Sequence, residues 1–161
     1  SKLYIEKKLS EEVFKDSFYD ECWPEFHSSP QIIKKGRTPL EMSIDCVEHN
    51  IGNTVMCKQI CGQFGSVENL IKHTNAIRYD HLFARTAWLV YDKAGEKLEF
   101  FCMPENYMPN PERFETLVAY RIDRSQFFSA EGIKLHDPVW NRVNWLTVTK
   151  RFRLALEKPK P

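Results

Sequence analysis

The sequence predicts an α+β fold in which a helical cluster packs on a mostly antiparallel β-sheet. The first observation is a change of period, because residues 1–80 repeat their apolar positions mainly at helical spacing, whereas residues 81–161 mainly alternate. The second is that helix-capping patterns gather in the first half and aromatic or branched runs in the second. A length of 161 residues corresponds to about one domain, so we expect residues 1–161 to form a single domain.

The N-terminal part is predicted to contain a strand and a helix. Residues 2–8 alternate between apolar and charged side chains, as a strand does. Ser10 is a typical N-cap, two glutamates follow it in the first helical turn, and apolar residues recur at helical spacing up to Cys22. Pro24 ends this helix, and a short strand is expected at Gln31–Lys34.

Three helices are predicted between residues 38 and 79. Residues 38–41 (Thr-Pro-Leu-Glu) have the form of a capping box with proline at the first helical position, and this helix should run to about His49. Residues 54–63 repeat their apolar positions at helical spacing and predict a second helix. Ser66 caps a third helix, whose apolar stripe is Val67, Leu70, Ile71, Thr74 and Ile77.

The second half predicts a β meander. Thr86–Tyr91 and Leu98–Met103 are rich in aromatic and branched residues and are joined by a short hairpin turn. Residues 105–112 contain two prolines, directly after Pro104, and are therefore expected to form a loop. Thr116–Ile122 reads as a third strand, and residues 129–137 as irregular structure.

Residues 143–156 are predicted to form the last strand of the sheet, because their side chains alternate. One face would be apolar and interrupted only by Lys150, and it comprises Leu146, Val148, Phe152, Leu154 and Leu156. The other face would be aromatic, polar and basic, and it comprises Trp145, Thr147, Thr149, Arg151 and Arg153.

The formal net charge of +1 is unevenly distributed along the chain. Residues 141–161 carry six basic side chains and one acidic side chain, a net charge of +5. Such a segment can contact phosphate or an acidic protein, although a basic, solvated terminus has the same composition. No window approaches the roughly 18 uninterrupted apolar residues that a membrane span needs, so no membrane contact is expected.

Five cysteines are an odd number, and none belongs to a C-x-x-C pair. Proteins of oxidising compartments normally carry an even, regularly spaced set of cysteines that forms disulfides. The sequence therefore predicts reduced thiols, most of them buried as small apolar groups, and a cytoplasmic location.

A turn at Ile51-Gly52-Asn53 joins the first two predicted helices of the cluster, and Phe64-Gly65-Ser66 leads into the third. Residues 51–73 locally resemble the helix-hairpin-helix module of DNA repair proteins and nucleases. The resemblance implies sequence-independent contact with DNA, in which backbone amides around Gly52, Asn53 and Thr54 meet a phosphate. Ordinary helical packing remains the alternative interpretation.

The predicted C-terminal strand is the second candidate nucleic-acid contact. An aromatic residue and two arginines on one strand face, Trp145, Arg151 and Arg153, could stack on bases and neutralise phosphates. A solvent-facing edge strand carries similar charges without any ligand. The leading hypothesis is accordingly a non-enzymatic protein that binds nucleic acid through this strand and the hairpin, with no cofactor.

The spacing of Cys57, Cys61, Phe64, Leu70 and His73 is also similar to that of a two-Cys, two-His zinc finger. The next histidine, His81, is eight positions after His73. On one helix the two residues would lie about 12 Å apart, too far to bind the same zinc ion. That resemblance implies a β-hairpin over residues 55–62, whereas the helix-hairpin-helix resemblance implies a helix there. Cys46 and His49 could supply substitute ligands, so zinc binding by Cys57, Cys61 and His73 stays an open alternative, although no metal is expected.

Two further function classes stay open. Nucleotide-binding, hydrolase and metalloprotease motifs are absent, which leaves an enzyme only with an unfamiliar site, for which Glu68, His73, His136 and Asp137 are the candidates. Aromatic residues make up 13% of the chain, and exposed aromatics mark protein-binding surfaces. An inhibitor or adaptor that grips another protein would use those of the β half, which include Trp88, Phe100, Phe101, Tyr107, Phe127, Phe128 and Trp140.

Overall fold

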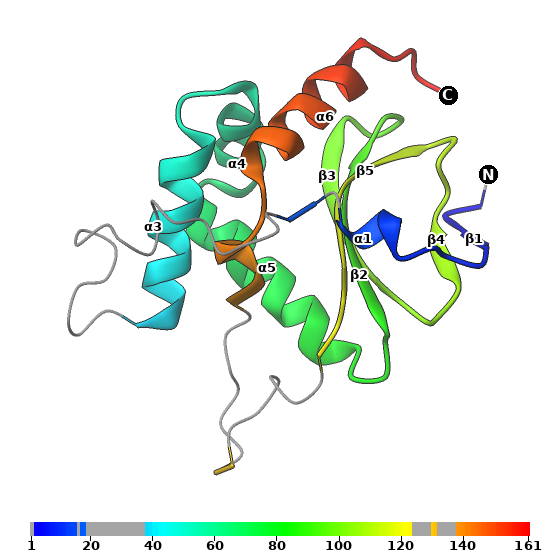
Figure 1. Ribbon diagram of the computed structural model, residues 1–161. Coiled ribbons are helices and arrows are strands. Elements are labelled where there is room, and N and C mark those ends of the chain that lie inside the picture. The colour runs from blue at the N-terminus through cyan, green and yellow to red at the C-terminus, as the bar shows by residue number, and fades with distance from the viewer. Residues whose placement is uncertain (1, 16, 19–37, 124–129, 132–137) are drawn as a thin grey trace.

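The structure is a computed structural model that describes residues 2–15, 17–18, 38–123, 130–131 and 138–161 (Figure 1). Its elements, in chain order, are β1 (Tyr4–Glu6), α1 (Glu12–Lys15), α3 (Pro39–Ile51), α4 (Val55–Phe64), α5 (Val67–Asp80), β2 (Thr86–Asp92), β3 (Lys97–Met103), β4 (Tyr107–Pro109), β5 (Phe114–Arg121), the 3-10 turn η2 (Pro138–Asn141) and α6 (Trp145–Glu157). The strand expected at Gln31–Lys34, the end of the first helix at Cys22 and most of residues 129–137 lie outside the described residues. The α+β fold class is confirmed.

The described elements form three layers around an antiparallel sheet with the strand order β3-β2-β5. Helices α3 to α6 cover one face of this sheet, whereas α1 and the β1–β4 pair cover the other (Figure 1). The central strand β2 is therefore buried along its whole length. Its side chains alternate between two cores, because Leu89 and Tyr91 face the helices while Trp88 and Val90 face α1 and β4.

The helix boundaries in the first half follow the predicted caps closely. Thr38 Oγ1 accepts a hydrogen bond from Glu41 N at 3.1 Å, and Glu41 Oε1 accepts one from Thr38 N at 3.2 Å, which completes the capping box. The backbone φ of +54° at Gly52 ends α3, and Thr54 starts α4 by capping the amide of Cys57. The predicted α3, α4 and α5 are confirmed, with α3 ending at Ile51 rather than His49.

The predicted C-terminal strand is wrong, because residues 145–157 form helix α6. The buried residues of this segment recur at helical spacing, and they are Trp145, Val148, Thr149, Phe152 and Ala155. Leu146 and Leu154, which a strand would have buried, are 70% and 51% exposed. The Asn144 side chain caps the helix by accepting a hydrogen bond from Thr147 N at 3.2 Å.

The predicted loop at residues 105–112 contains the short strand β4, which pairs antiparallel with β1. Pro109 has no N–H, but it lies opposite Tyr4, at a position of the ladder that needs none. Asn110 N donates to Leu3 O at 3.0 Å, and Lys7 N donates to Asn106 O at 2.8 Å, on either side of this pair. The N-terminal strand predicted at residues 2–8 is thus confirmed as β1.

Side chains cap part of each edge of the three-stranded sheet. At the β3 edge, the Gln63 amide forms two hydrogen bonds with the backbone of Leu98, at 2.7 and 2.8 Å. At the β5 edge, Arg151 Nη1 donates to Leu117 O at 3.0 Å, and Ala119 N donates to Ser17 Oγ at 3.2 Å. Capping of this kind removes the backbone groups with which a foreign strand would pair.

In the described part of the chain, no helix combines the length and the apolar character needed to cross a membrane. Four of the five cysteines fall in the described residues, and all four are free thiols. They are Cys46, Cys57, Cys61 and Cys102.

Candidate functional site

The hairpin between α3 and α4 has the connectivity that the helix-hairpin-helix resemblance implies. Gly52 and Asn53 are exposed at its tip, whereas the Thr54 hydroxyl is engaged in capping and also donates to Ile51 O at 2.8 Å. The two helices of the hairpin carry three acidic residues and only one lysine, Lys58. The charge near the hairpin is therefore unfavourable for phosphate, and the Gly52 N–H already donates to Glu48 O at 3.3 Å.

The other predicted nucleic-acid contacts, Trp145, Arg151 and Arg153, lie on different sides of α6, because this segment is a helix and not a strand. Trp145 is fully buried and stacks on Trp140, with ring centroids 6.0 Å apart. The Arg151 guanidinium donates hydrogen bonds to Ser17 Oγ and Leu117 O, so it caps the edge of β5. Only Arg153 of these three residues is exposed. The structure does not bring them together on one face.

The zinc-finger resemblance is not supported by the local structure. Residues 55–64 form a helix, in which the sulfur atoms of Cys57 and Cys61 lie 4.0 Å apart. The His73 ring packs on Phe64 instead, at a centroid distance of 5.4 Å, and His81 Nδ1 contacts Ile77 O at 2.8 Å. Among the residues described, no three His, Cys, Asp or Glu side chains gather in a way that could hold a metal ion.

The candidate catalytic residues do not form a site in the described part of the protein. Glu68 is exposed on α5 and pairs with Lys72 at 2.9 Å. His73 lies on the same helix against Phe64. His136 and Asp137 lie outside the described residues.

The aromatic residues of the β half divide between core and surface. Trp88, Phe100 and Trp140 are buried. Phe101 and Tyr107 are half-buried, at the margin of the core between the sheet and the β1–β4 pair. Phe127 and Phe128 lie outside the described residues.

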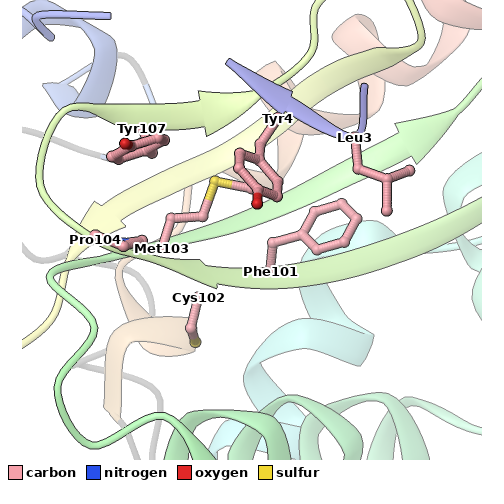
Figure 2. Close-up of a pocket in the computed structure, with 7 residues that line it drawn as sticks. All are labelled: Leu3, Tyr4, Phe101, Cys102, Met103, Pro104 and Tyr107. Carbon is pink, nitrogen blue, oxygen red and sulfur yellow. The ribbon is translucent and has the colours of Figure 1, made fainter. Parts of the chain in front are cut away.

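An apolar pocket opens beside those two half-buried aromatics, between β1 and β3 (Figure 2). Its volume is about 520 Å³, within the range of small-molecule and side-chain sites. Figure 2 shows Leu3 and Tyr4 projecting into it from the N-terminal strand and Phe101 from β3, whereas Cys102 points to the opposite side of β3. The pocket is lined by Leu3, Tyr4, Phe101, Cys102, Met103, Pro104 and Tyr107.

Aromatic contacts hold the walls of this pocket in place. The Tyr4 and Tyr107 rings meet edge to face at a centroid distance of 5.9 Å, and Phe101 packs in the same way on Phe114 at 5.2 Å. Leu3 and Tyr4 nevertheless remain 47% and 56% exposed. Apolar side chains exposed at the mouth of a pocket favour the binding of another apolar group.

The outer edge of β1 borders the same pocket and is open. Leu3 and Lys7 form their backbone hydrogen bonds with the β4 side, so the backbone groups of Tyr4 and Glu6 point away from β4. Within the described residues, these outward groups have no hydrogen-bond partner. A second hollow of about 710 Å³ follows β1 and shares Leu3, Tyr4 and Tyr107 with the pocket.

The charge along β1 is mainly positive. Lys2, Lys7 and Lys8 are exposed, and none of them pairs with an acidic residue of the described chain. Glu6 is the only acidic residue between them. Arg121 pairs with two other acids, Glu11 at 2.6 Å and Glu105 at 3.0 Å, and its hydrogen bond lowers the pKa of Glu11.

Comparison with known proteins gives no family: no protein-family model matches the chain, and no curated protein matches it significantly. The geometry of the described residues is therefore the basis for the function proposed below.

Sequence reasoning placed the aromatics of the β half at a possible binding surface, but it missed Leu3 and Tyr4. The signal available for them was a short apolar strand flanked by lysines at the start of the chain. Its partner, β4, was hidden by the prolines at 104, 109 and 111.

Proposed function

We propose that this protein is a non-enzymatic binding module that captures an extended, acidic segment of another protein at the outer edge of β1. The segment adds a strand to the β1–β4 pair through the outward backbone groups of Tyr4 and Glu6. An apolar side chain of the segment enters the pocket between Leu3, Phe101 and Tyr107. Exposed lysines at both ends of β1 favour acidic residues on either side of that apolar residue.

The single observation that supports this proposal is the contrast between sheet edges. The edges of β3 and β5 are capped at Leu98, Leu117 and Ala119 by Gln63, Arg151 and Ser17, whereas no residue along the edge of β1 is capped within the described residues, and this edge lies beside an apolar pocket. Edge strands that are left open beside a pocket are the usual recipients of an added strand. The odd number of cysteines favours a partner in the reducing cytoplasm.

The test is to select binding peptides from a random peptide-display library, to label the selected peptides and to measure their affinity by fluorescence anisotropy. We expect peptides with an apolar residue between acidic ones. Glu6→Pro removes the outward N–H without touching the β1–β4 ladder, and Leu3→Asp places a carboxylate in the pocket. Each substitution should weaken binding by more than about tenfold, the effect of one lost hot-spot contact.

Leu154→Asp is the matched control, because Leu154 on α6 is 51% exposed and Leu3 is 47% exposed. It should bind the selected peptides as the unchanged protein does. Peptides that bind Glu6→Pro and Leu3→Asp with full affinity would refute the proposal. A protein that sediments as a dimer, and becomes a monomer with Glu6→Pro, would show instead that a second copy occupies the edge.

Nucleic-acid binding is the second candidate function. It is favoured by the exposed hairpin tip at Gly52 and Asn53 and by exposed Lys150 and Arg153 on α6, which packs against α3 and α4. Labelled single- and double-stranded DNA and RNA should then bind in an anisotropy assay, with affinity that falls as salt rises. Lys150→Ala with Arg153→Ala should reduce the salt slope by about 2. Absence of binding at low salt would exclude this function.

A further inference from the structure

A pair of thiols stands apart from the pocket, on the surface of α4. Cys57 and Cys61 are one helical turn apart, and their sulfur atoms are separated by 4.0 Å. Cys61 is exposed and Cys57 is half-buried, whereas the core of this helix is formed by Met56 and Ile60. Packing of the helix therefore does not require both cysteines.

The environment of Cys46 provides a contrast. That thiol is buried, its sulfur lies 3.9 Å from Trp140 O, and burial raises its pKa to about 12. Such a cysteine behaves as a small apolar side chain. Cys57 is half-buried and Cys61 is exposed, and their sulfur atoms contact each other.

We propose that Cys57 and Cys61 together bind a soft metal ion of low coordination number, of the Cu(I) class. Thiolates select such ions, and Cu(I) does not require the four ligands of a structural zinc site. With metal–sulfur bonds of about 2.3 Å, as in zinc thiolates, an ion that bridges a 4.0 Å separation has an S–M–S angle of about 120°. The helix need not distort, and a third position remains open toward solvent.

The chemistry of binding is balanced without a redox step. Each thiol gives up its proton to solvent, two metal–sulfur bonds form, and the ion keeps its oxidation state. Glu48 on α3 carries a negative charge close enough to act on Cys57. A cation between the two sulfurs removes the repulsion between the thiolates and is attracted by Glu48.

Anaerobic titration with Cu(I), in competition with a chromophoric Cu(I) chelator, tests the proposal. The protein should withdraw one equivalent of Cu(I) and develop the ultraviolet absorption of Cu(I)–thiolate bonds. Cys57→Ser and Cys61→Ser should each lower the affinity by more than about tenfold, as expected when a metal site loses a ligand. Circular dichroism checks that these variants keep their helices.

Two controls test whether Cu(I) binding needs this particular pair of cysteines or only thiols in general. Cys102→Ser removes a half-buried thiol of β3 and should leave Cu(I) binding unchanged. Cys61→Ser combined with Gly62→Cys keeps the number of thiols but moves one of them around the helix, and it should bind as weakly as Cys61→Ser. Full binding by this shifted variant, or no withdrawal of Cu(I) by the unchanged protein, would overturn the proposal.

Discussion

Trp145→Ala is expected to destabilise the protein by about 3–5 kcal/mol, the usual cost of truncating a buried tryptophan. Trp145 is fully buried in the core between the helices and the sheet, and its ring stacks on Trp140. The truncation leaves a cavity at the first turn of α6, which the rigid packing around it cannot fill. Urea unfolding followed by circular dichroism measures the change in the free energy of unfolding.

Leu146→Ala is the matched control for this experiment. The two residues are adjacent in α6, but Leu146 is 70% exposed, so its truncation should change the free energy of unfolding by less than about 0.5 kcal/mol. Equal losses for the two variants would contradict the helical assignment of residues 145–157. This comparison also distinguishes α6 from a strand, because an alternating strand would have buried Leu146 and exposed Trp145.

Arg113→Met is expected to destabilise the protein, because it removes both side-chain hydrogen bonds that Arg113 donates to Asp92. The Asp92 carboxylate is buried at the end of β2, and it accepts hydrogen bonds from Arg113 Nε at 3.0 Å and Arg113 Nη2 at 2.9 Å. Removal of the arginine leaves the Asp92 carboxylate without its charged partner, and only backbone groups such as Ala94 N, at 3.0 Å, still donate to it.

The pH dependence of this effect follows from the same pair. Hydrogen bonding to Arg113 lowers the pKa of Asp92 below its usual range. The pair therefore stabilises the folded protein above pH ~4, the unfolded value, and this contribution is lost as the pH falls through the lowered folded pKa. The difference in unfolding free energy between the unchanged protein and Arg113→Met should shrink below pH ~4.

Asp92→Asn combined with Arg113→Met completes a double-mutant cycle. The combined variant has no buried charge at position 92, so it should be more stable at neutral pH than Arg113→Met alone. Additive losses over the cycle would show that the pair contributes no coupling.

The Asp92 carboxylate also lies close to the backbone of Gly95. A Cβ at position 95 would lie 2.7 Å from Asp92 Oδ2, so a larger residue there would disturb the pair.

Local signals explain which elements the sequence predicted well. The box at Thr38 and Glu41 fixes the start of α3 through its own side chains, so no distant contact is needed. The caps Thr54 and Ser66 act in the same way for the next two helices. The strands β2 and β3 were equally readable from their aromatic and branched residues, because these side chains fill the two cores on opposite faces of one sheet.

The error at α6 has a different cause. Val148 and Phe152 fit both a strand period and a helical one, and the exposed leucines completed the false alternation. The structure shows Asn144 as the N-cap of α6, which was not predicted from the sequence, because the branched and aromatic composition of the segment favoured a strand. The basic face that followed from this error, Trp145 with Arg151 and Arg153, has no counterpart in the structure.

The candidate pocket could not be predicted for a third reason. Tyr4 meets Tyr107 and Pro109 only after a separation of about a hundred residues, and no local pattern specifies that pairing. The dithiol of α4 was readable as a spacing, but the sequence left open whether residues 55–62 form a helix or a hairpin. The helix places the two sulfur atoms on one face, and in the described residues no histidine joins them as a third ligand.

Leu3 and Phe18 pair with residues more than a hundred positions later, and this has a consequence during synthesis on the ribosome. Leu3 bonds to Asn110, and Phe18 forms a bridge with Val143. At roughly 5–20 residues per second, these partners emerge about 5–25 s after the N-terminal segment. Helices α3 to α5 contact one another and can dock in that interval. The waiting segment is apolar at Leu3, Tyr4 and Ile5, and the lysines around it act as gatekeepers against aggregation of the nascent chain.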